Sequence, residues 1–301
     1  MNAAPPPEHL QRDYPLARLT TIRTGGNADW FARPRKEQEL EGLLAWAQEE
    51  GLDVGVVGSG SNLLVADLGF AGLVLKLDGS LAAIEHEATR LLCGGGARLP
   101  QAAARAAALG LGGIEFGVSI PGTVGGAVRM NANAYGGELS RALEWVDVCT
   151  AAGIDRRRPE QLGFAYRRSN LGPGEIVARV SFSLETQDPQ TVKATLADLR
   201  GRRREAQPSG IKTFGSTFKN PDPDRTAGRL LEEAGCKGLQ VGDARFSPKH
   251  ANFIENLGTA TTAEVVSLIA EGRRRVSEHS GVLLEPEVQL LGDVEFPWEE
   301  R

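Results

Sequence analysis

Gly58-Ser59-Gly60-Ser61-Asn62 and Ile120-Pro121-Gly122-Thr123-Val124-Gly125-Gly126-Ala127 carry the strongest structural signal in the chain. Both are dense in glycine and small side chains, and the first follows a short apolar run that is typical of a buried strand. Glycine lets the backbone approach a ligand closely, and successive N–H groups in such turns form anion-binding nests. Two nests on separate segments predict a site for the two phosphates of a dinucleotide, with tight structural turns as the alternative.

Two common nucleotide-binding motifs are absent from the sequence. The third glycine of a GxGxxG fingerprint that starts at Gly58 would fall at position 63, which is Leu63. No GxxxxGK[ST] phosphate loop occurs anywhere in the chain. The sequence therefore argues against a Rossmann unit and against a P-loop nucleotidase.

Mixed periodicity along the chain predicts the α+β fold class. Helical spacing marks residues 36–50, 101–109, 192–204 and 229–233, and a Thr261-x-x-Glu264 capping box opens a further helix. Strand-like runs lie at 54–57, 71–77, 89–93, 144–150, 176–184 and 282–291. Pro208-Ser209-Gly210 is the best linker candidate, and the basic run Arg202-Arg203-Arg204 is most simply a solvated helix end.

Composition bounds the class of protein. A length of 301 residues suggests two domains, or three small ones, and 41% hydrophobic residues allow a core of normal size. The net charge of −5 argues against general nucleic-acid binding, which needs a basic face. Cys93, Cys149 and Cys236 are scattered and odd in number, which indicates reduced thiols, and the four histidines lack metal-ligand spacing. We expect no metal site.

No signal peptide is evident, and no run of about 18 apolar residues occurs. These features predict a protein that works in the cytoplasm, without a membrane or a nucleic acid as partner.

Three further segments carry groups suited to catalysis or binding. Gly215-Ser216-Thr217-Phe218-Lys219-Asn220-Pro221 combines a hydroxyl, a cation and an amide, although a turn closed by Asn-Pro is the simpler interpretation. Tyr166-Arg167-Arg168-Ser169 places cations beside a ring. In an extended stretch Glu285 and Glu287 would share one face, although paired surface carboxylates are usually only solvated.

Taken in order, these segments form the pattern of a known family. The additional pieces are Thr24-Gly25-Gly26-Asn27-Ala28, Met130-Asn131-Ala132, Lys249-His250-Ala251-Asn252-Phe253 and Pro286-Glu287-Val288. The chain resembles the UDP-N-acetylenolpyruvoylglucosamine reductases from about residue 15 to residue 292. Each motif is moderately specific, whereas the ordered set is highly specific.

The proline-rich residues 1–15 predict a flexible arm. The resemblance implies an FAD-binding region of the p-cresol methylhydroxylase and vanillyl-alcohol oxidase type, at 16–207, and a substrate-binding domain at 208–301. The FAD-binding region would have lobes at about 16–78 and 79–207. The short interval between Arg167 and Gly215 indicates the family form without an inserted loop. Asn133 replaces a frequent glycine, which could alter the flavin-loop backbone, and Arg168 replaces a frequent Asp or Asn.

The resemblance also implies the chemistry. NADPH would reduce FAD, and the enolpyruvyl group of UDP-N-acetylglucosamine enolpyruvate would then receive the hydride at its methylene carbon. Arg167 would hold the developing negative charge, Ser216 would donate the proton, and Glu287 would accompany them in a protonated or proton-sharing state. NADPH and the UDP-sugar would take turns in one pocket.

The remaining site residues follow from the same resemblance. Those expected to bind the substrate are Tyr166, Lys219, Asn220 and His250. Those expected to bind FAD are Gly58, Ser59, Gly60, Ser61, Asn62, Leu63, Pro121, Gly122, Thr123, Gly125, Gly126 and Ala127.

Two other functions stay open at this stage. One is an oxidase of small alcohols with the same FAD-binding fold, and the other is a nucleotide-sugar binding module without catalysis. The sequence does not specify the oligomeric state, and a monomer is the working expectation.

Overall fold

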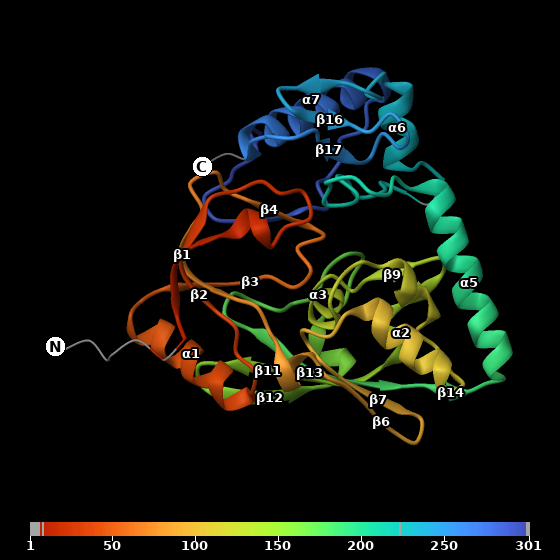
Figure 1. Ribbon diagram of the computed structural model, residues 1–301. Coiled ribbons are helices and arrows are strands. Elements are labelled where there is room, and N and C mark those ends of the chain that lie inside the picture. Colours follow the sequence, from red (N-terminus) through yellow and green to blue (C-terminus); the bar gives the residue numbers. More distant parts are fainter. Residues whose placement is uncertain (1–6, 8, 223, 299–301) are drawn as a thin grey trace. The chain divides into compact units, whose positions relative to one another are not determined.

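The computed structural model describes residue 7 and residues 9–222 and 224–298 (Figure 1). This part of the chain forms two compact units, each assembled from separate stretches. Unit 1 comprises Trp30–Ser59, Gly72–Arg203 and the described residues before Asp13, and unit 2 comprises Asp13–Asp29, Gly60–Ala71 and the described residues from Arg204 onward. The functional domains predicted at 16–207 and 208–301 stay a prediction, because the two compact units divide the chain at other residues.

Unit 1 contains a five-stranded antiparallel sheet (Figure 1). Its strands, in spatial order, are β12 (Gly153–Arg157), β11 (Leu143–Thr150), β13 (Ile176–Ser183), β7 (Arg90–Gly94) and β6 (Ile84–Glu87). The central strand β13 contributes apolar side chains to both faces of the sheet. Val180 and Phe182 join one hydrophobic cluster, whereas Ile176 and Ala178 join another. This strand therefore lies between two cores, although three polar residues interrupt its apolar sequence.

Helices of unit 1 pack on this sheet. Helix α1 (Glu37–Glu49) buries Leu40, Leu43, Leu44 and Ala47 at helical spacing, as the sequence predicts. The remaining elements are η2 (Gly79–Ala82), α2 (Leu99–Ala108), β8 (Leu111–Gly112), η3 (Glu115–Ser119), α3 (Val124–Arg129), β9 (Asn133–Ala134), β10 (Gly137–Glu138), α4 (Leu139–Ala142), η4 (Pro159–Leu162) and β14 (Glu185–Thr186).

Four elements begin in one unit and end in the other. They are β1 (Gln11–Pro15), β2 (Asn27–Ala32), β5 (Phe70–Leu75) and α5 (Pro189–Ala206). The three strands share a sheet with β3 (Asp53–Val56) in the order β1-β2-β5-β3, and β3 runs parallel to β5. Residues 1–6 and 8 of the predicted flexible arm lie outside the described residues, whereas Gln11–Pro15 forms β1.

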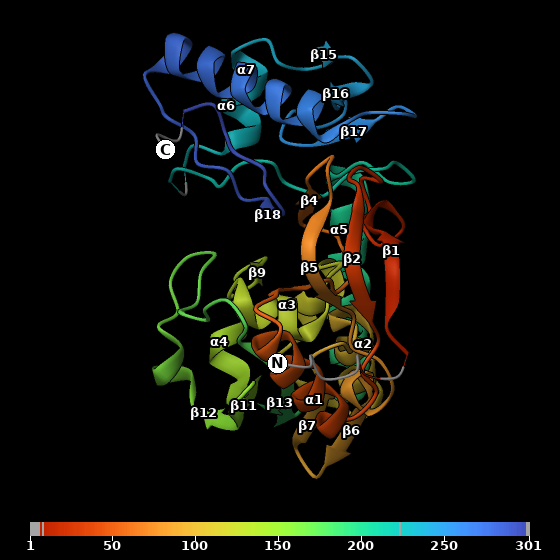
Figure 2. The ribbon, with the colours of Figure 1, turned by 90° about the vertical axis from the view of Figure 1, so that its left-hand side faces the viewer.

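Unit 2 is built around helix α7 (Thr262–Ser280), which packs on β15 (Gln240–Val241) and β16 (Ala244–Phe246) (Figure 2). The predicted capping box is confirmed, because the Thr261 hydroxyl accepts from Glu264 N and the Glu264 carboxylate accepts from Thr261 N. The other elements are η1 (Leu16–Arg18), β4 (Leu63–Val65), α6 (Ala227–Glu233), β17 (Ile254–Asn256) and β18 (Gln289–Leu291). Its core joins Ile22 and Leu64 to side chains of the C-terminal stretch.

Two local predictions are corrected by the structure. The last strand covers only Gln289–Leu291, because Pro286 has no N–H to donate and pairs with Phe218 in a single bridge instead. The basic run at the end of α5 is not uniformly solvated. Arg203 is half-buried and donates to Ser119 O, and burial lowers the pKa of its guanidinium.

All three cysteines are free and buried, as expected for reduced thiols. Burial raises the pKa of the Cys93 and Cys149 thiols to about 12 and that of Cys236 to about 11. The reactive thiolate form is therefore disfavoured at all three positions at neutral pH.

Candidate active site

The two small-residue segments meet in unit 1 through Gly58 and Thr123. A Cβ at position 58 would collide with Thr123 Oγ1, so only glycine leaves room for this approach. Thr123 also pairs with Arg98 in an antiparallel bridge, and Leu99 N donates to Gly122 O at 3.0 Å. The structure thus brings together the first residue of one predicted loop and the middle of the other.

The amides at the start of α3 are already used within the chain. Val124 N donates to Ala97 O and Gly125 N donates to Gly95 O, both at 2.8 Å, and Gly126 N donates to the Thr123 hydroxyl at 3.3 Å. These three N–H groups therefore do not form the predicted anion nest, and anion binding by this loop would depend on Gly122, Thr123 and neighbouring charges.

Cations gather beside this glycine contact, which sequence reasoning missed. Lys76 is half-buried, and its Nζ donates to Gly58 O. Burial lowers the pKa of this ammonium, and the charges of Arg33 and Arg98 lower it further, against an opposing effect of Asp78. Lys76 directly follows the apolar residues of β5. A lysine at the end of a buried strand is the sequence signal that could have indicated this cation. The cluster suits a diphosphate, because an anion would offset the mutual repulsion.

The Tyr166–Arg167 pair sits in a tight turn of unit 1. Ala165 and Arg168 exchange backbone hydrogen bonds at 2.9 and 3.1 Å, and Arg167 has a φ of +56°. Left-handed backbone is unusual for arginine, so surrounding contacts must hold it. The Arg167 Nη1 donates to Asn133 O at 3.1 Å, and the guanidinium lies 5.5 Å from the centre of the Tyr166 ring.

Buried Asn131 ties this turn to the preceding loop. Its Nδ2 donates to Ala165 O at 3.3 Å and to Glu138 Oε1 at 2.8 Å, and the latter bond lowers the pKa of Glu138. Asn133 lies in strand β9 and outside the left-handed region. The loop backbone therefore accommodates Asn133 without positive φ.

Ser216 belongs to unit 2, in a segment held from two sides. On one side Ser216 pairs with Phe253 in an antiparallel bridge, and Thr217 N donates to Asn252 O at 2.8 Å. On the other side Glu287 N donates to Thr217 O at 2.8 Å. The structure thus bonds Glu287 to the residue that directly follows the predicted proton donor Ser216. Arg167 lies in unit 1, so the grouping of all three side chains stays a prediction.

Part of the predicted cofactor segment joins this region of unit 2. Asn62 Nδ2 donates to Glu287 O at 3.2 Å, and Gln289 N donates to Asn62 O at 3.0 Å. β4 and β18 then continue as a parallel pair. Gly60 has a φ of +62°, and a Cβ there would collide with Leu19 O. Glycine is required at position 60 by the fold itself.

Lys219 and Asn220 already have partners. Lys219 Nζ forms an ion pair with Glu285 Oε1, and Lys219 N donates to Glu285 O at 2.9 Å. Asn220 Oδ1 accepts from Ala227 N at 3.0 Å and so supports the start of α6. The carboxylate of Glu285 thus neutralises the charge of Lys219.

The surroundings of His250 favour a neutral imidazole. Its Nδ1 accepts from Asn252 N at 3.2 Å, and its ring meets Phe253 edge-on at a centroid distance of 4.9 Å. Burial lowers the pKa of the imidazole below its ordinary 6.5. A proton on Nδ1 would remove the acceptor, so both effects favour the neutral form.

We expect His250→Asn to flatten the dependence of Tm on pH. The folded-state pKa of His250 is depressed, so its contribution to stability is complete above pH 6.5 and is lost as pH falls toward the folded value. Asparagine keeps an acceptor near Nδ1 but does not titrate. Calorimetry between pH 7.5 and 5 checks this, with His279→Asn, an exposed histidine of the same unit, as control. Equal slopes for wild type and His250→Asn would contradict it.

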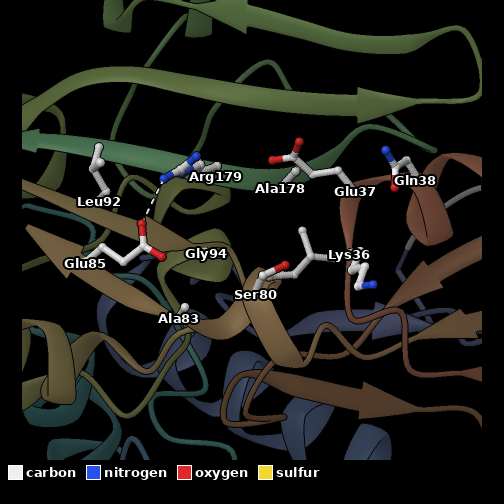
Figure 3. Close-up of a pocket in the computed structure, with 11 residues that line it drawn as sticks. Lys36, Glu37, Gln38, Ser80, Ala83, Glu85, Leu92, Gly94, Ala178 and Arg179 are labelled. Atoms are coloured by element: carbon white, nitrogen blue, oxygen red, sulfur yellow. Dashed lines mark hydrogen bonds and ion pairs between the residues drawn. The ribbon is translucent and has the colours of Figure 1, made fainter.

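A cavity of about 290 Å³ opens in unit 1 beside the N-terminal end of α1 (Figure 3). Lys36, Glu37, Ser80 and an Arg179–Glu85 ion pair of 3.1 Å line it. None of the predicted site residues contributes to its lining, and its charges are mixed in sign. The cavity therefore does not coincide with the predicted site.

Two kinds of feature are missing from the described residues. No group of three or more His, Cys, Asp or Glu side chains there is arranged to hold a metal ion. Among the same residues, no helix has the length and apolar content needed to cross a bilayer.

Two family models match separate parts of the chain. Residues 28–155 match the family model described as FAD binding domain. Residues 207–291 match the model described as UDP-N-acetylenolpyruvoylglucosamine reductase, C-terminal domain.

Individual proteins are similar over almost the whole length. UDP-N-acetylenolpyruvoylglucosamine reductase 2 of Symbiobacterium thermophilum is 44% identical over 97% of this chain and 94% of its own. The reductase of Myxococcus xanthus is 46% identical over 93% and 91%, respectively. The crystal structure of UDP-N-acetylenolpyruvylglucosamine reductase from Thermus caldophilus superposes with a TM-score of 0.82 at 38% identity, covering 94% of this chain and 99% of that one. The predicted α+β class with an FAD-binding domain is confirmed.

Proposed function

Because the chain belongs to the UDP-N-acetylenolpyruvoylglucosamine reductase family, we propose that Arg167, Ser216 and Glu287 divide the protein's share of that reduction among them. The protein is an FAD-dependent oxidoreductase of peptidoglycan precursor synthesis that reduces UDP-N-acetylglucosamine enolpyruvate to UDP-N-acetylmuramate with NADPH. This assignment rests on the similarity to a reductase that is 44% identical over 97% of this chain. It decides against the alcohol oxidase and the non-catalytic binding module.

The residues of unit 1 fit an FAD diphosphate. Gly58 and Thr123 approach each other where a Cβ would block the space, and Lys76 brings a cation to the same point. Electrostatic attraction from Lys76, Arg33 and Arg98 would favour a doubly charged group there. When bound, FAD accepts hydride from NADPH and delivers it to the substrate.

The residues proposed to hold FAD are those expected from the sequence, with Lys76 added. They are Gly58, Ser59, Gly60, Ser61, Asn62, Leu63, Lys76, Pro121, Gly122, Thr123, Gly125, Gly126 and Ala127.

Arg167 stabilises negative charge in the proposed reaction. Hydride addition at the methylene carbon leaves an enolate-like substrate, with charge shared between the neighbouring carbon and the carboxylate. A guanidinium is always charged and matches a carboxylate's geometry. The turn that fixes Arg167 in left-handed backbone supports this role, because a preorganised cation needs no reorganisation during the reaction.

Ser216 donates the proton that completes the reduction, and Glu287 supports it. A hydroxyl is a weak acid, so its partner must stabilise the alkoxide or resupply the proton. The backbone bond from Glu287 N to Thr217 O supports this pairing, because it holds the two residues on adjacent segments. Glu287 is proposed to be protonated or to share a proton when the substrate is bound, since a full carboxylate would repel the enolate.

Tyr166, Lys219, Asn220 and His250 are proposed to bind the substrate. Lys219 would exchange its ion pair with Glu285 for a phosphate or carboxylate of the UDP-sugar. His250 would act as a neutral donor through Nε2, since Nδ1 is occupied. We further propose that the enzyme works as a cytoplasmic monomer, with neither a membrane nor a nucleic acid as partner.

The visible spectrum tests the assignment. We expect a yellow purified protein that NADPH bleaches without oxygen and that UDP-N-acetylglucosamine enolpyruvate recolours, with UDP-N-acetylmuramate as product. Recolouring by oxygen alone, or no bleaching by NADPH, would contradict the assignment.

A further inference from the structure

The side chain of Asn252 binds the backbone of the Ser216 segment in unit 2. Asn252 is 4% exposed. Its Oδ1 accepts from Phe218 N and its Nδ2 donates to Phe218 O, both at 2.9 Å. A peptide N–H only donates and a peptide carbonyl only accepts, so these two partners fix the orientation of the amide. One side chain thus satisfies both backbone groups of Phe218, as a neighbouring strand would.

Backbone contacts extend this attachment toward Ser216. Thr217 N donates to Asn252 O at 2.8 Å, and Ser216 and Phe253 form the next bridge. Asn252 therefore contacts the two residues that directly follow Ser216. Its removal would leave two polar groups of the Ser216 segment unsatisfied in a buried place.

Asn252 is itself held rigidly. Its own N–H donates to His250 Nδ1 at 3.2 Å, and Phe253 N donates to His250 O at 3.0 Å. These bonds close a tight turn that presents the amide at a fixed angle. A continuous set of hydrogen bonds therefore leads from His250 through Asn252 to the backbone that carries Ser216.

We propose that Asn252 is a positioning residue that sets the location of the Ser216 hydroxyl for proton transfer. The inference rests on the proposed role of Ser216 as proton donor. A general acid must lie within hydrogen-bond reach of the atom it protonates, and a displacement of about 1 Å costs on the order of 10²-fold in rate. A side chain that fixes the adjacent backbone is suited to prevent such a displacement.

Asn252→Asp tests the proposal through pH. An ionised carboxylate would face Phe218 O without a proton to donate, whereas a protonated carboxyl restores both bonds of the amide. The measured quantity is the rate of flavin reoxidation by saturating UDP-sugar, as a ratio to wild type at the same pH. Burial and the facing Phe218 O should raise the pKa of the new carboxyl well above the ordinary value of about 3.9. We therefore expect a ratio near one at pH 5.5 that falls on the order of 10²-fold by pH 8.5. Flavin reduction by NADPH should match wild type throughout.

Asn256→Asp is the matched control. Asn256 is a second buried asparagine of unit 2, but its side chain bonds Ile22 O, Gly258 N and Ala260 N rather than the Ser216 segment. It should lower Tm without a pH-dependent loss of reoxidation. If Asn252→Asp does not fold, Asn252→Gln takes its place. That variant keeps the amide on a longer arm, and reoxidation should slow while reduction stays intact.

The double variant separates this inference from the proposed function. If Asn252 acts through Ser216, adding Asn252→Asp to Ser216→Ala lowers reoxidation less than about twofold, because coupled changes are not additive. The positioning role would be overturned if the two substitutions slowed reoxidation by the product of their separate factors. It would also be overturned if the reoxidation rate of Asn252→Asp, as a ratio to wild type, did not change with pH. Unchanged reoxidation in Ser216→Ala alone would instead overturn the proposed role of Ser216 as proton donor.

Discussion

Ser216→Ala should slow flavin reoxidation by the UDP-sugar at least about 10²-fold while reduction by NADPH stays fast. A positioned general acid contributes about 10²–10⁴ in rate, or roughly 3–5 kcal/mol of barrier, and alanine removes its only transferable proton. Reduction involves no proton from this hydroxyl, so the two half-reactions should separate. Anaerobic stopped-flow absorbance records each of them in turn.

The control for Ser216→Ala is Ser267→Ala. Ser267 is an exposed serine of α7 whose hydroxyl donates to Ala263 O within the helix. Its replacement by alanine also removes a serine hydroxyl, but at a position outside the proposed site. Both half-reactions should keep wild-type rates in this variant. A trace in which Ser216→Ala loses reduction but keeps reoxidation would refute the proposed proton transfer.

Gly58→Val should weaken FAD binding on the order of 10²-fold and give a nearly colourless protein. The new side chain would collide with Thr123 Oγ1 at the contact between the two loops. Overpacking costs roughly 1–3 kcal/mol, and about 1.4 kcal/mol corresponds to a tenfold change in affinity. Titration of the apoprotein with FAD, followed by fluorescence, measures the dissociation constant without any need for activity.

Gly42→Val makes the same exchange at a glycine of α1 where an added Cβ would meet no atom within 4 Å. FAD affinity should not change there. If Gly58→Val lowered Tm but bound FAD as tightly as wild type, the two loops would be tight structural turns and the proposed diphosphate site would be wrong.

Local periodicity was sufficient to predict much of the architecture. Helix α1 follows from apolar residues at helical spacing, and α7 follows from the capping box at Thr261. Both signals are local, since a helix face repeats every 3.6 residues and a cap spans one turn. The stretch 282–291 has the apolar pattern of a strand, but Pro286 interrupts the pairing and only Gln289–Leu291 is a strand.

Long-range partners could not be predicted in this way. Nothing near Asn252 in the sequence indicates that its amide binds Phe218, which lies 34 positions away. Lys76 meets Gly58 only because β5 pairs with β3, and the arginines whose charges act on Lys76 come from other parts of the chain. The family motifs named Ser216 and Glu287, whereas the contact through Thr217 that joins them is visible only in the folded structure.

The interleaving of unit 2 has a consequence for biosynthesis. Residues 13–29 and 60–71 leave the ribosome before residues 204–301 have been translated. Strand β4 pairs with β18, so its backbone edge lacks this partner until residues 289–291 have been translated. An open strand edge is a template for wrong pairing. A nascent chain that ends before β18 therefore exposes an unpaired strand edge at Leu63–Val65.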